Sequence, residues 1–171
     1  MKGEPTGAGT ANGRDSGQDG GDHLTRPVPS PGSRLPSFRS LILDVDSTLS
    51  GIEGIDWLAQ RRGAEVGAQV TALTDRAMAG EIPLDAVYGE RLALIRPTRA
   101  EVDALGDVYL ATVALDARET IARFHAAGVV VVLVSGGLRE AILPLARHVG
   151  IADDRVHAVG VRFDAAGEYA G

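Results

Sequence analysis

The stretch that decides the fold is Leu41-Ile42-Leu43-Asp44-Val45-Asp46-Ser47-Thr48-Leu49. Its apolar start predicts a strand that runs to about Val45 and is buried on both faces, as in a parallel sheet. Because side chains alternate along a strand, Asp44 and Asp46 emerge on the same side at its carboxyl end. Ligands bind at that edge in open α/β sheets. Two carboxylates aimed at one point repel each other, so the pair predicts a cation, a proton or chemistry that uses both.

Composition narrows the classes of function. The chain has 171 residues and a formal net charge of -6, and its acidic pI of about 5.2 argues against nucleic acid as the main partner. No apolar run approaches the roughly 18 residues of a membrane span, so we expect no membrane partner. The sequence contains no cysteine, which excludes disulfides and thiolate metal sites and fits a cytoplasmic location.

The chain divides into three regions by composition and periodicity. Residues 1–38 hold eight of the 22 glycines and five of the eight prolines, so we expect a disordered tail and assign it no function. Residues 39–50 and 114–171 are expected to form an α/β core, and residues 51–113 a helical cap. Four short helices are predicted in that cap, the third beginning near Pro83 and the fourth at a capping box of Thr98 and Glu101.

An α/β rhythm resumes after the helical region. Its predicted elements are a helix from about Asp116 to Ala127, a buried strand over Val129–Val134 and a further strand over Val156–Phe163. The segment Ser135-Gly136-Gly137 is expected to break the middle strand. The helix that follows contains Pro144, which predicts a late helix start or a kink. A turn is expected at residues 165–168.

The polar motifs suggest phosphate chemistry. Asp44 is the candidate nucleophile, since a carboxylate can attack phosphorus and form an aspartyl phosphate. Asp46 is the candidate general acid and base. Ser135, with the amides of Gly136 and Gly137, predicts an anion site where a strand meets a helix N-terminus, and magnesium would offset the repulsion between phosphate and carboxylates. Alone, Asp-x-Asp also occurs as a manganese site in nucleotide-sugar glycosyltransferases, and Ser-Gly-Gly is often only a turn.

Together, in this order, the motifs resemble the haloacid dehalogenase (HAD) superfamily and, within it, the phosphoserine phosphatases. The likeness covers residues 40–171 and rests on the segments Asp44–Thr48, Glu53–Asp56, Arg76–Met78, Glu90–Ile95, Val134–Gly137 and Gly167–Gly171. It implies an α/β fold, a HAD-like Rossmannoid parallel sheet that is incomplete at the C-terminus, with an inserted helical cap. It also implies hydrolysis of O-phosphoserine to serine and phosphate with Mg²⁺, the last step of serine biosynthesis, and leaves a homodimer open.

The resemblance implies a role for each candidate residue. Asp44 would be the nucleophile and a magnesium ligand through its side chain. Asp46 would be the proton donor and would hold magnesium through its backbone carbonyl. The substrate-binding residues would be Glu53 for the ammonium group, Arg91 for the carboxylate, Met78 for the serine pocket, and Ser135, Gly136 and Gly137 for the phosphate.

The sequence departs from the family pattern after Gly171. The family continues with a lysine that steadies the phosphoryl group and a Gly-Asp-Gly motif that completes the magnesium site. We therefore expect a truncated phosphatase with weak magnesium binding, an open sheet edge beside Leu41–Leu43, and low or no activity alone. Two alternatives stay open: a HAD phosphatase for another small phosphate ester, and a non-catalytic fragment that only binds a ligand or partner.

Overall fold

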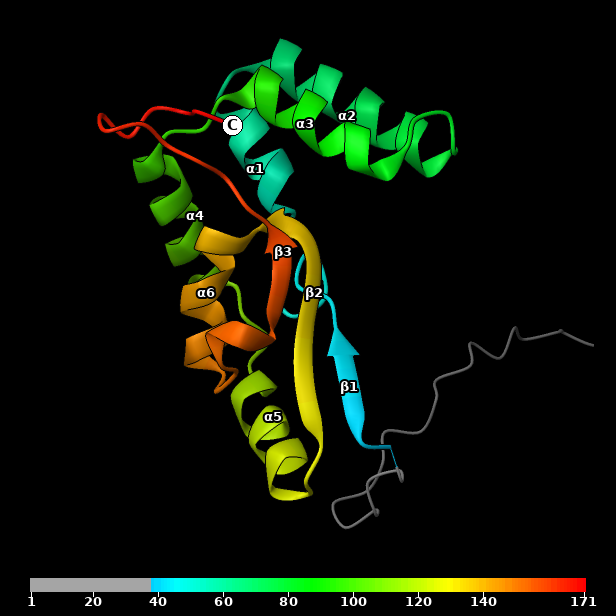
Figure 1. The fold of residues 1–171 in the computed structure, drawn as a ribbon, viewed down its shortest axis with the longest axis vertical. Helices are drawn as coiled ribbons and strands as arrows, with labels where there is room; N and C mark the ends of the chain where they lie inside the picture. Colours follow the sequence, from blue (N-terminus) through cyan, green and yellow to red (C-terminus); the bar gives the residue numbers. More distant parts are fainter. Residues whose placement is uncertain (1–37) are drawn as a thin grey trace, which may run out of the picture. The chain divides into compact units, whose positions relative to one another are not determined.

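The structure is a computed structural model that describes residues 38–171. The predicted N-terminal tail lies almost wholly outside these residues. Within them the chain forms a three-stranded sheet and six α-helices (Figure 1). No helix of this part of the chain is long and apolar enough to cross a membrane.

The sheet is parallel throughout, with the strand order β1-β2-β3. Its strands are β1 (Ser40–Leu43), β2 (Val130–Leu138) and β3 (Val156–Val159). Parallel neighbours joined by helical crossovers confirm the predicted α/β class. β1 ends at Leu43 and not at Val45, because the carbonyl of Val45 accepts hydrogen bonds from a tight loop instead of a neighbouring strand.

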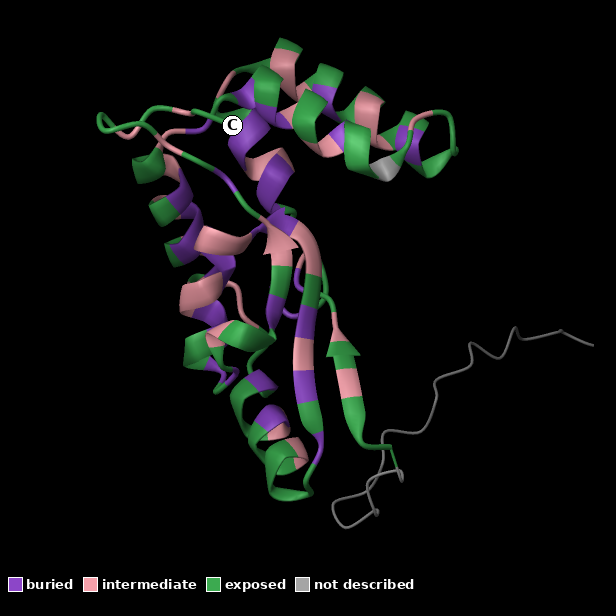
Figure 2. Ribbon diagram, in the orientation of Figure 1, coloured by how far each residue is buried: buried purple, intermediate pink, exposed green. Residues whose placement is uncertain are grey.

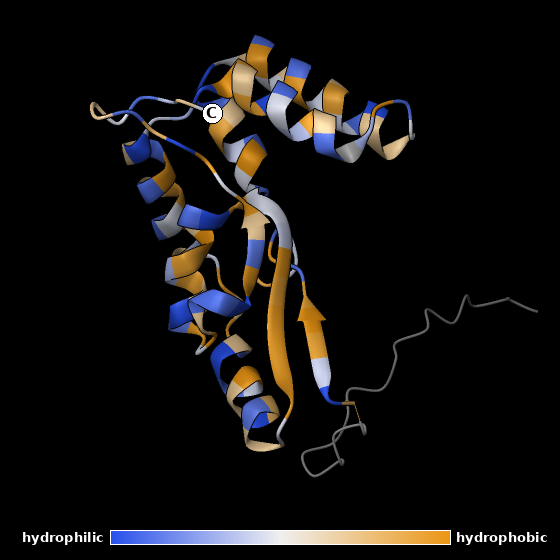
Figure 3. Ribbon diagram, in the orientation of Figure 1, coloured by the Kyte–Doolittle hydropathy of each residue, from blue (hydrophilic) through white to orange (hydrophobic). Residues whose placement is uncertain are grey.

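Helices of the described residues cover one face of this sheet. α5 (Ala117–Ala126) and α6 (Arg139–His148) lie on the same side (Figure 1), where Val131 and Leu133 of β2 are buried. On the opposite side, Ile42 is 70% exposed and Val134 is 45% exposed, although both strands are strongly apolar (Figures 2 and 3). The expectation of a strand buried on both faces is therefore wrong for β1 within residues 38–171.

Four helices lie between β1 and α5. These are α1 (Gly54–Gln60), α2 (Ala64–Met78), α3 (Leu84–Ile95) and α4 (Arg99–Ala111). The predicted capping box is confirmed: Glu101 N–H donates to Thr98 Oγ1 over 3.3 Å, and Thr98 N–H donates to the Glu101 carboxylate over 2.8 Å. α1 packs mainly against α2 and also contacts α3 and α4, and α4 packs mainly against α6. The division into core and cap at residues 51–113 stays a prediction.

β2 is longer than the sequence suggests. It continues through Ser135, Gly136 and Gly137, so the predicted strand break is wrong. α6 begins immediately afterwards at Arg139 and contains Pro144, so the late helix start is wrong and the alternative of a kink stays a prediction. Pairing with β3 is irregular after Val134 and resumes at Leu138. Neither glycine adopts a positive φ, so nothing in their backbone conformation forces the chain out of the extended region.

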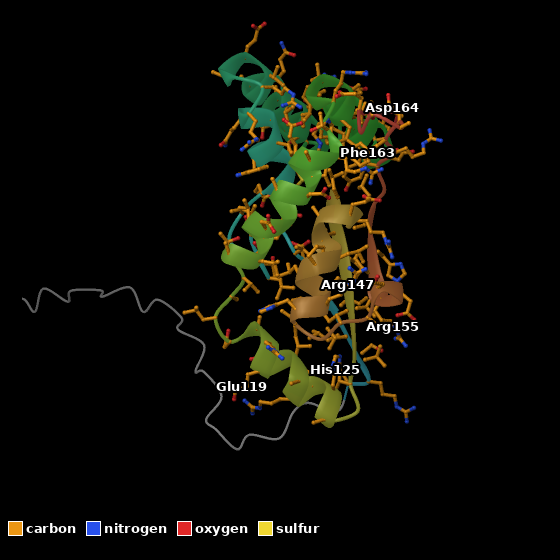
Figure 4. The ribbon with its side chains drawn as sticks, turned by 90° about the vertical axis from the view of Figure 1, so that its left-hand side faces the viewer. Glu119, His125, Arg147, Arg155, Phe163 and Asp164 are labelled. Carbon is orange, nitrogen blue, oxygen red and sulfur yellow. The ribbon has the colours of Figure 1, made fainter. Side chains whose placement is uncertain are left out.

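The chain after β3 forms a turn and not a longer strand. β3 stops at Val159, and Phe163 makes only an isolated bridge to Tyr169. The predicted turn is confirmed: the Asp164 carboxylate accepts hydrogen bonds from the amides of Ala166 and Glu168, each over 2.9 Å. Phe163 and Asp164 lie together at the start of this turn (Figure 4). A side chain that satisfies two amides replaces the strand ladder here.

Candidate active site

The two aspartates stand at the entrance to a tight loop after β1. The carbonyl of Val45 accepts hydrogen bonds from the amides of Thr48, Leu49 and Ser50 over 3.0 to 3.2 Å. This winding leaves Asp44 exposed and Asp46 half-buried beyond the carboxyl end of β1. The predicted placement of the pair at the sheet edge is therefore confirmed.

The Asp46 carboxylate accepts three hydrogen bonds from three separate segments. Gly54 N–H and Tyr109 O–H donate to Oδ1 over 2.7 and 2.6 Å, and Ser135 O–H donates to Oδ2 over 2.9 Å. The Ser135 oxygen in turn accepts from the Gly137 amide over 2.9 Å. Donors to a carboxylate stabilise its negative charge and fix its orientation. Asp46 is consequently held in one orientation, whereas Asp44 faces the solvent.

Tyr109 is a site residue that sequence reasoning missed. It is fully buried on α4, and burial, followed by the negative charge of Asp46, raises the pKa of its hydroxyl far above the usual range. The hydroxyl therefore stays protonated and remains a donor to Asp46 at any ordinary pH. A signal was present: Val102, Leu105 and Tyr109 form one buried stripe of α4, and a tyrosine on such a stripe needs a partner for its hydroxyl.

Two glycines make room for this network. A Cβ atom at Gly137 would lie 2.7 Å from Asp46 Oδ2 and 2.9 Å from the Tyr109 oxygen, and a Cβ atom at Gly54 would collide with the Tyr109 hydroxyl. Both positions therefore require glycine for a close approach, and not for an unusual backbone conformation. The sequence predicted Gly137 as a phosphate ligand, but its amide hydrogen is committed to Ser135.

The predicted anion site also differs in its architecture. Because β2 extends to Leu138, the amides of Gly136 and Gly137 belong to the strand and not to the N-terminus of α6. The first residue of α6, Arg139, is therefore two residues after Gly137 and three after Gly136, so the helix dipole does not start at these amides. The Ser135 hydroxyl and the backbone at Gly136 remain beside the aspartates.

A cavity of about 240 Å³ opens beside the two aspartates. Its walls contain seven of the eight predicted site residues, namely Asp44, Asp46, Glu53, Met78, Arg91, Gly136 and Gly137. Ser135, the eighth, reaches the same place through its hydrogen bond to Asp46. The structure thus brings together residues from the loop after β1, the N-cap of α1, α2, α3 and β2 that are separated by up to 93 positions in the sequence.

The residues on the helical side of the cavity differ in exposure. Glu53 is exposed at the N-cap of α1, and Met78, the last residue of α2, is 80% exposed at the rim. Arg91 is half-buried on α3, and its Nη1 donates to Thr74 Oγ1 over a long 3.3 Å. Its Nε is buried and has no hydrogen-bond partner among the described residues. A buried donor without a partner is costly, which marks Arg91 as a candidate ligand-binding residue.

The oxygen atoms at the site fit a weakly held magnesium ion. Asp44 Oδ2 accepts a hydrogen bond from the Thr48 hydroxyl over 3.1 Å, and the Asp46 side chain is committed to its three donors. No group of three or more acidic, histidine or cysteine side chains that could hold a metal ion occurs in residues 38–171. A divalent cation here would depend on the Asp44 carboxylate, on water and on substrate oxygens, a ligand set that Mg²⁺ accepts.

Comparison with known proteins finds similarity to phosphoserine phosphatases. No protein-family model matches the chain. It is 39% identical over 135 residues to the phosphoserine phosphatases of Rattus norvegicus and Homo sapiens, an overlap that covers 79% of this chain and 59% of theirs. The chain therefore spans about three fifths of the length of these relatives.

Solved structures share the fold. A phosphoserine phosphohydrolase-like protein from Francisella tularensis superposes with a TM-score of 0.71 at 22% identity, covering 78% of this chain and 64% of that one. A phospho-aspartyl intermediate analogue of phosphoserine phosphatase superposes with a TM-score of 0.59 at 27% identity, covering 77% and 60%. In sequence the chain is similar to phosphoserine phosphatases, and in fold it is similar to solved structures of such enzymes.

Proposed function

We propose that the protein hydrolyses O-phosphoserine to serine and phosphate, the last step of serine biosynthesis. The observation that carries the proposal is the pairing of an exposed Asp44 with an oriented Asp46 in a cavity that also contains Glu53 and Arg91. The similarity to rat and human phosphoserine phosphatases supports it.

In the proposed reaction, an oxygen of Asp44 attacks the phosphorus atom and the bond from phosphorus to the serine oxygen breaks. Asp46, in the protonated state that this step requires, gives its proton to that oxygen, so serine leaves as a neutral alcohol. Water then attacks the phosphorus of the aspartyl phosphate while Asp46 takes the water proton. Phosphate leaves and both carboxyl groups return to their starting state.

The cavity side chains match the charges of the substrate. Glu53 is an anion for the substrate ammonium group, and the Arg91 guanidinium offers a planar fork for its carboxylate. The buried and unpartnered Nε of Arg91 supports a ligand at this position. Ser135, with the backbone at Gly136, would bind phosphate oxygens. Met78 would line the side of the pocket that holds the serine moiety.

Magnesium is proposed as the cofactor. Asp44 would hold it through the side chain and Asp46 through the backbone carbonyl. When bound, the ion offsets the negative charge that phosphate and the two aspartates bring together. We expect weak binding, since the described residues contain no group of three or more acidic, histidine or cysteine side chains that could hold a metal ion.

The test is a single-turnover assay of the full 171-residue chain with O-phosphoserine and Mg²⁺. We expect slow phosphate release and a phosphoryl group trapped on the protein, both of which Asp44→Asn abolishes. Phosphate release that continues in Asp44→Asn would refute the assignment of Asp44 as the nucleophile. A chain that neither binds nor cleaves phosphoserine would refute the proposed function. Turnover at ordinary enzyme rates would instead refute the expectation of weak activity.

A second candidate keeps the fold but takes another small phosphate ester. Glu53 and Arg91 separate the two possibilities, because they face the groups that distinguish an amino acid from other alcohols. Glu53→Gln together with Arg91→Gln should abolish the preference for phosphoserine over glycerol phosphate. An unchanged preference would favour the alternative ester. Binding without any turnover would favour a non-catalytic role.

A further inference from the structure

We propose that Tyr88 is a substrate-binding residue whose hydroxyl donates to the phosphate group and whose ring holds Arg91 in place. The inference rests on the proposed function, because it assigns a ligand to the same cavity. Tyr88 lies on α3, is half-buried and lines the cavity together with both aspartates. The sequence analysis gave it no role.

The position of the hydroxyl carries the first part of the inference. A Cβ atom built at Gly136 would lie 2.9 Å from the Tyr88 oxygen and 3.3 Å from its Cε1. The tyrosine from the helical segment therefore occupies the space that a side chain at position 136 would fill. Because Gly136 follows Ser135, which contacts Asp46, the Tyr88 hydroxyl stands beside the proposed phosphate site as a neutral donor. Such a donor can bind a phosphate oxygen without adding charge.

The position of the ring carries the second part. The Arg91 guanidinium carbon lies 5.1 Å from the centre of the Tyr88 ring, at the i, i+3 spacing that brings side chains together on a helix. Contact of a guanidinium with an aromatic face is favourable by roughly 0.5 to 2 kcal/mol. The hydrogen bond from Arg91 Nη1 to Thr74 Oγ1 is long, 3.3 Å. We therefore attribute the orientation of the Arg91 guanidinium mainly to its contact with the Tyr88 ring. Tyr88 thereby links the phosphate end of the cavity to its carboxylate end.

Calorimetry of the full chain with Mg²⁺ tests both parts, using three ligands. Inorganic phosphate probes the phosphate contact, phosphoethanolamine adds the amine, and O-phosphoserine adds the carboxylate. Loss of one hydrogen bond in Tyr88→Phe should raise all three dissociation constants about three- to tenfold. Tyr88→Leu, which also removes the ring, should weaken phosphoserine by a further factor of about five relative to phosphoethanolamine. Tyr169→Phe serves as the control, since Tyr169 is outside this cavity.

The outcomes separate this inference from the proposed function. Phosphate affinity within twofold of wild type in Tyr88→Phe, or no phosphate binding by the wild-type chain, would overturn the role of Tyr88. Hydrolysis of phosphoserine could then still be observed, and the proposed function would stand. If phosphate binding depends on the Tyr88 hydroxyl but the chain never cleaves phosphoserine, the proposed function is refuted. The proposed contact of Tyr88 with phosphate would still be supported.

Discussion

Replacing Tyr109 with phenylalanine removes one hydroxyl from the centre of the site and keeps the aromatic ring. The lost hydrogen bond is short, 2.6 Å, and ends on the Asp46 carboxylate in the interior. Hydrogen bonds to charged groups contribute about 1.5 to 3 kcal/mol to folding. Asp46 keeps its bonds from Gly54 and Ser135, so we expect the lower half of that range. The free energy of unfolding should fall by about 2 kcal/mol.

Urea unfolding followed by circular dichroism measures this loss. With a slope of about 1 to 3 kcal/mol per molar urea, the midpoint of Tyr109→Phe should fall by roughly 1 M at an unchanged slope. Tyr169→Phe is the matched control, because Tyr169 lies outside the Asp46 network. A double-mutant cycle with Asp46→Asn should show coupling between the two positions. Equal midpoints for the two phenylalanine variants, or a cycle without coupling, would refute the assignment of stability to this bond.

Three further predictions concern pH, packing and metal. Arg62 donates to Glu101 over 2.5 and 2.6 Å and lowers the pKa of that carboxyl to about 2; this stability is present above pH 4.5 and lost as the pH falls toward 2. Glu101→Gln should therefore cost about 1 to 3 kcal/mol at pH 7 and almost nothing at pH 2 in urea titrations, and an equal cost at both would contradict this. Gly54→Ala should strongly lower the thermal midpoint because the methyl group meets the Tyr109 hydroxyl, whereas Gly67→Ala, in open space on α2, should raise it slightly. Removing magnesium with EDTA should weaken phosphate binding in calorimetry and leave the thermal midpoint unchanged, since a weakly held ion adds little stability; a lowered midpoint would show a tighter site.

Local patterns in the sequence were sufficient to predict most of the helices and strands. The capping box at Thr98 and Glu101 predicts the start of α4 because its two hydrogen bonds form within four residues. The placement of Asp44 and Asp46 at a sheet edge follows in the same way from an apolar run and strand alternation. The fold class was accessible because the motifs occur in the order of a known family, and seven of the eight predicted site residues line the cavity.

The errors arise where long-range pairing overrides local preference. Ser135-Gly136-Gly137 has the composition of a turn, yet β2 continues through it to Leu138 because pairing with β3 resumes there. The open face of β1, where Ile42 is exposed, depends on which helices cover the sheet. An apolar run in the sequence predicts a strand, but it does not specify whether one or both faces of that strand are covered by helices.

The sequence by itself indicated the helices, the apolar strand segments and the two aspartates, because those features depend on neighbouring residues. Only the tertiary structure decided what surrounds Asp46. Gly54, Tyr109 and Ser135 lie 8, 63 and 89 positions away from it, and they meet only when α1, α4 and β2 pack together. A hydrogen bond requires atoms within about 3 Å of each other, and distance along the chain carries no information about such proximity.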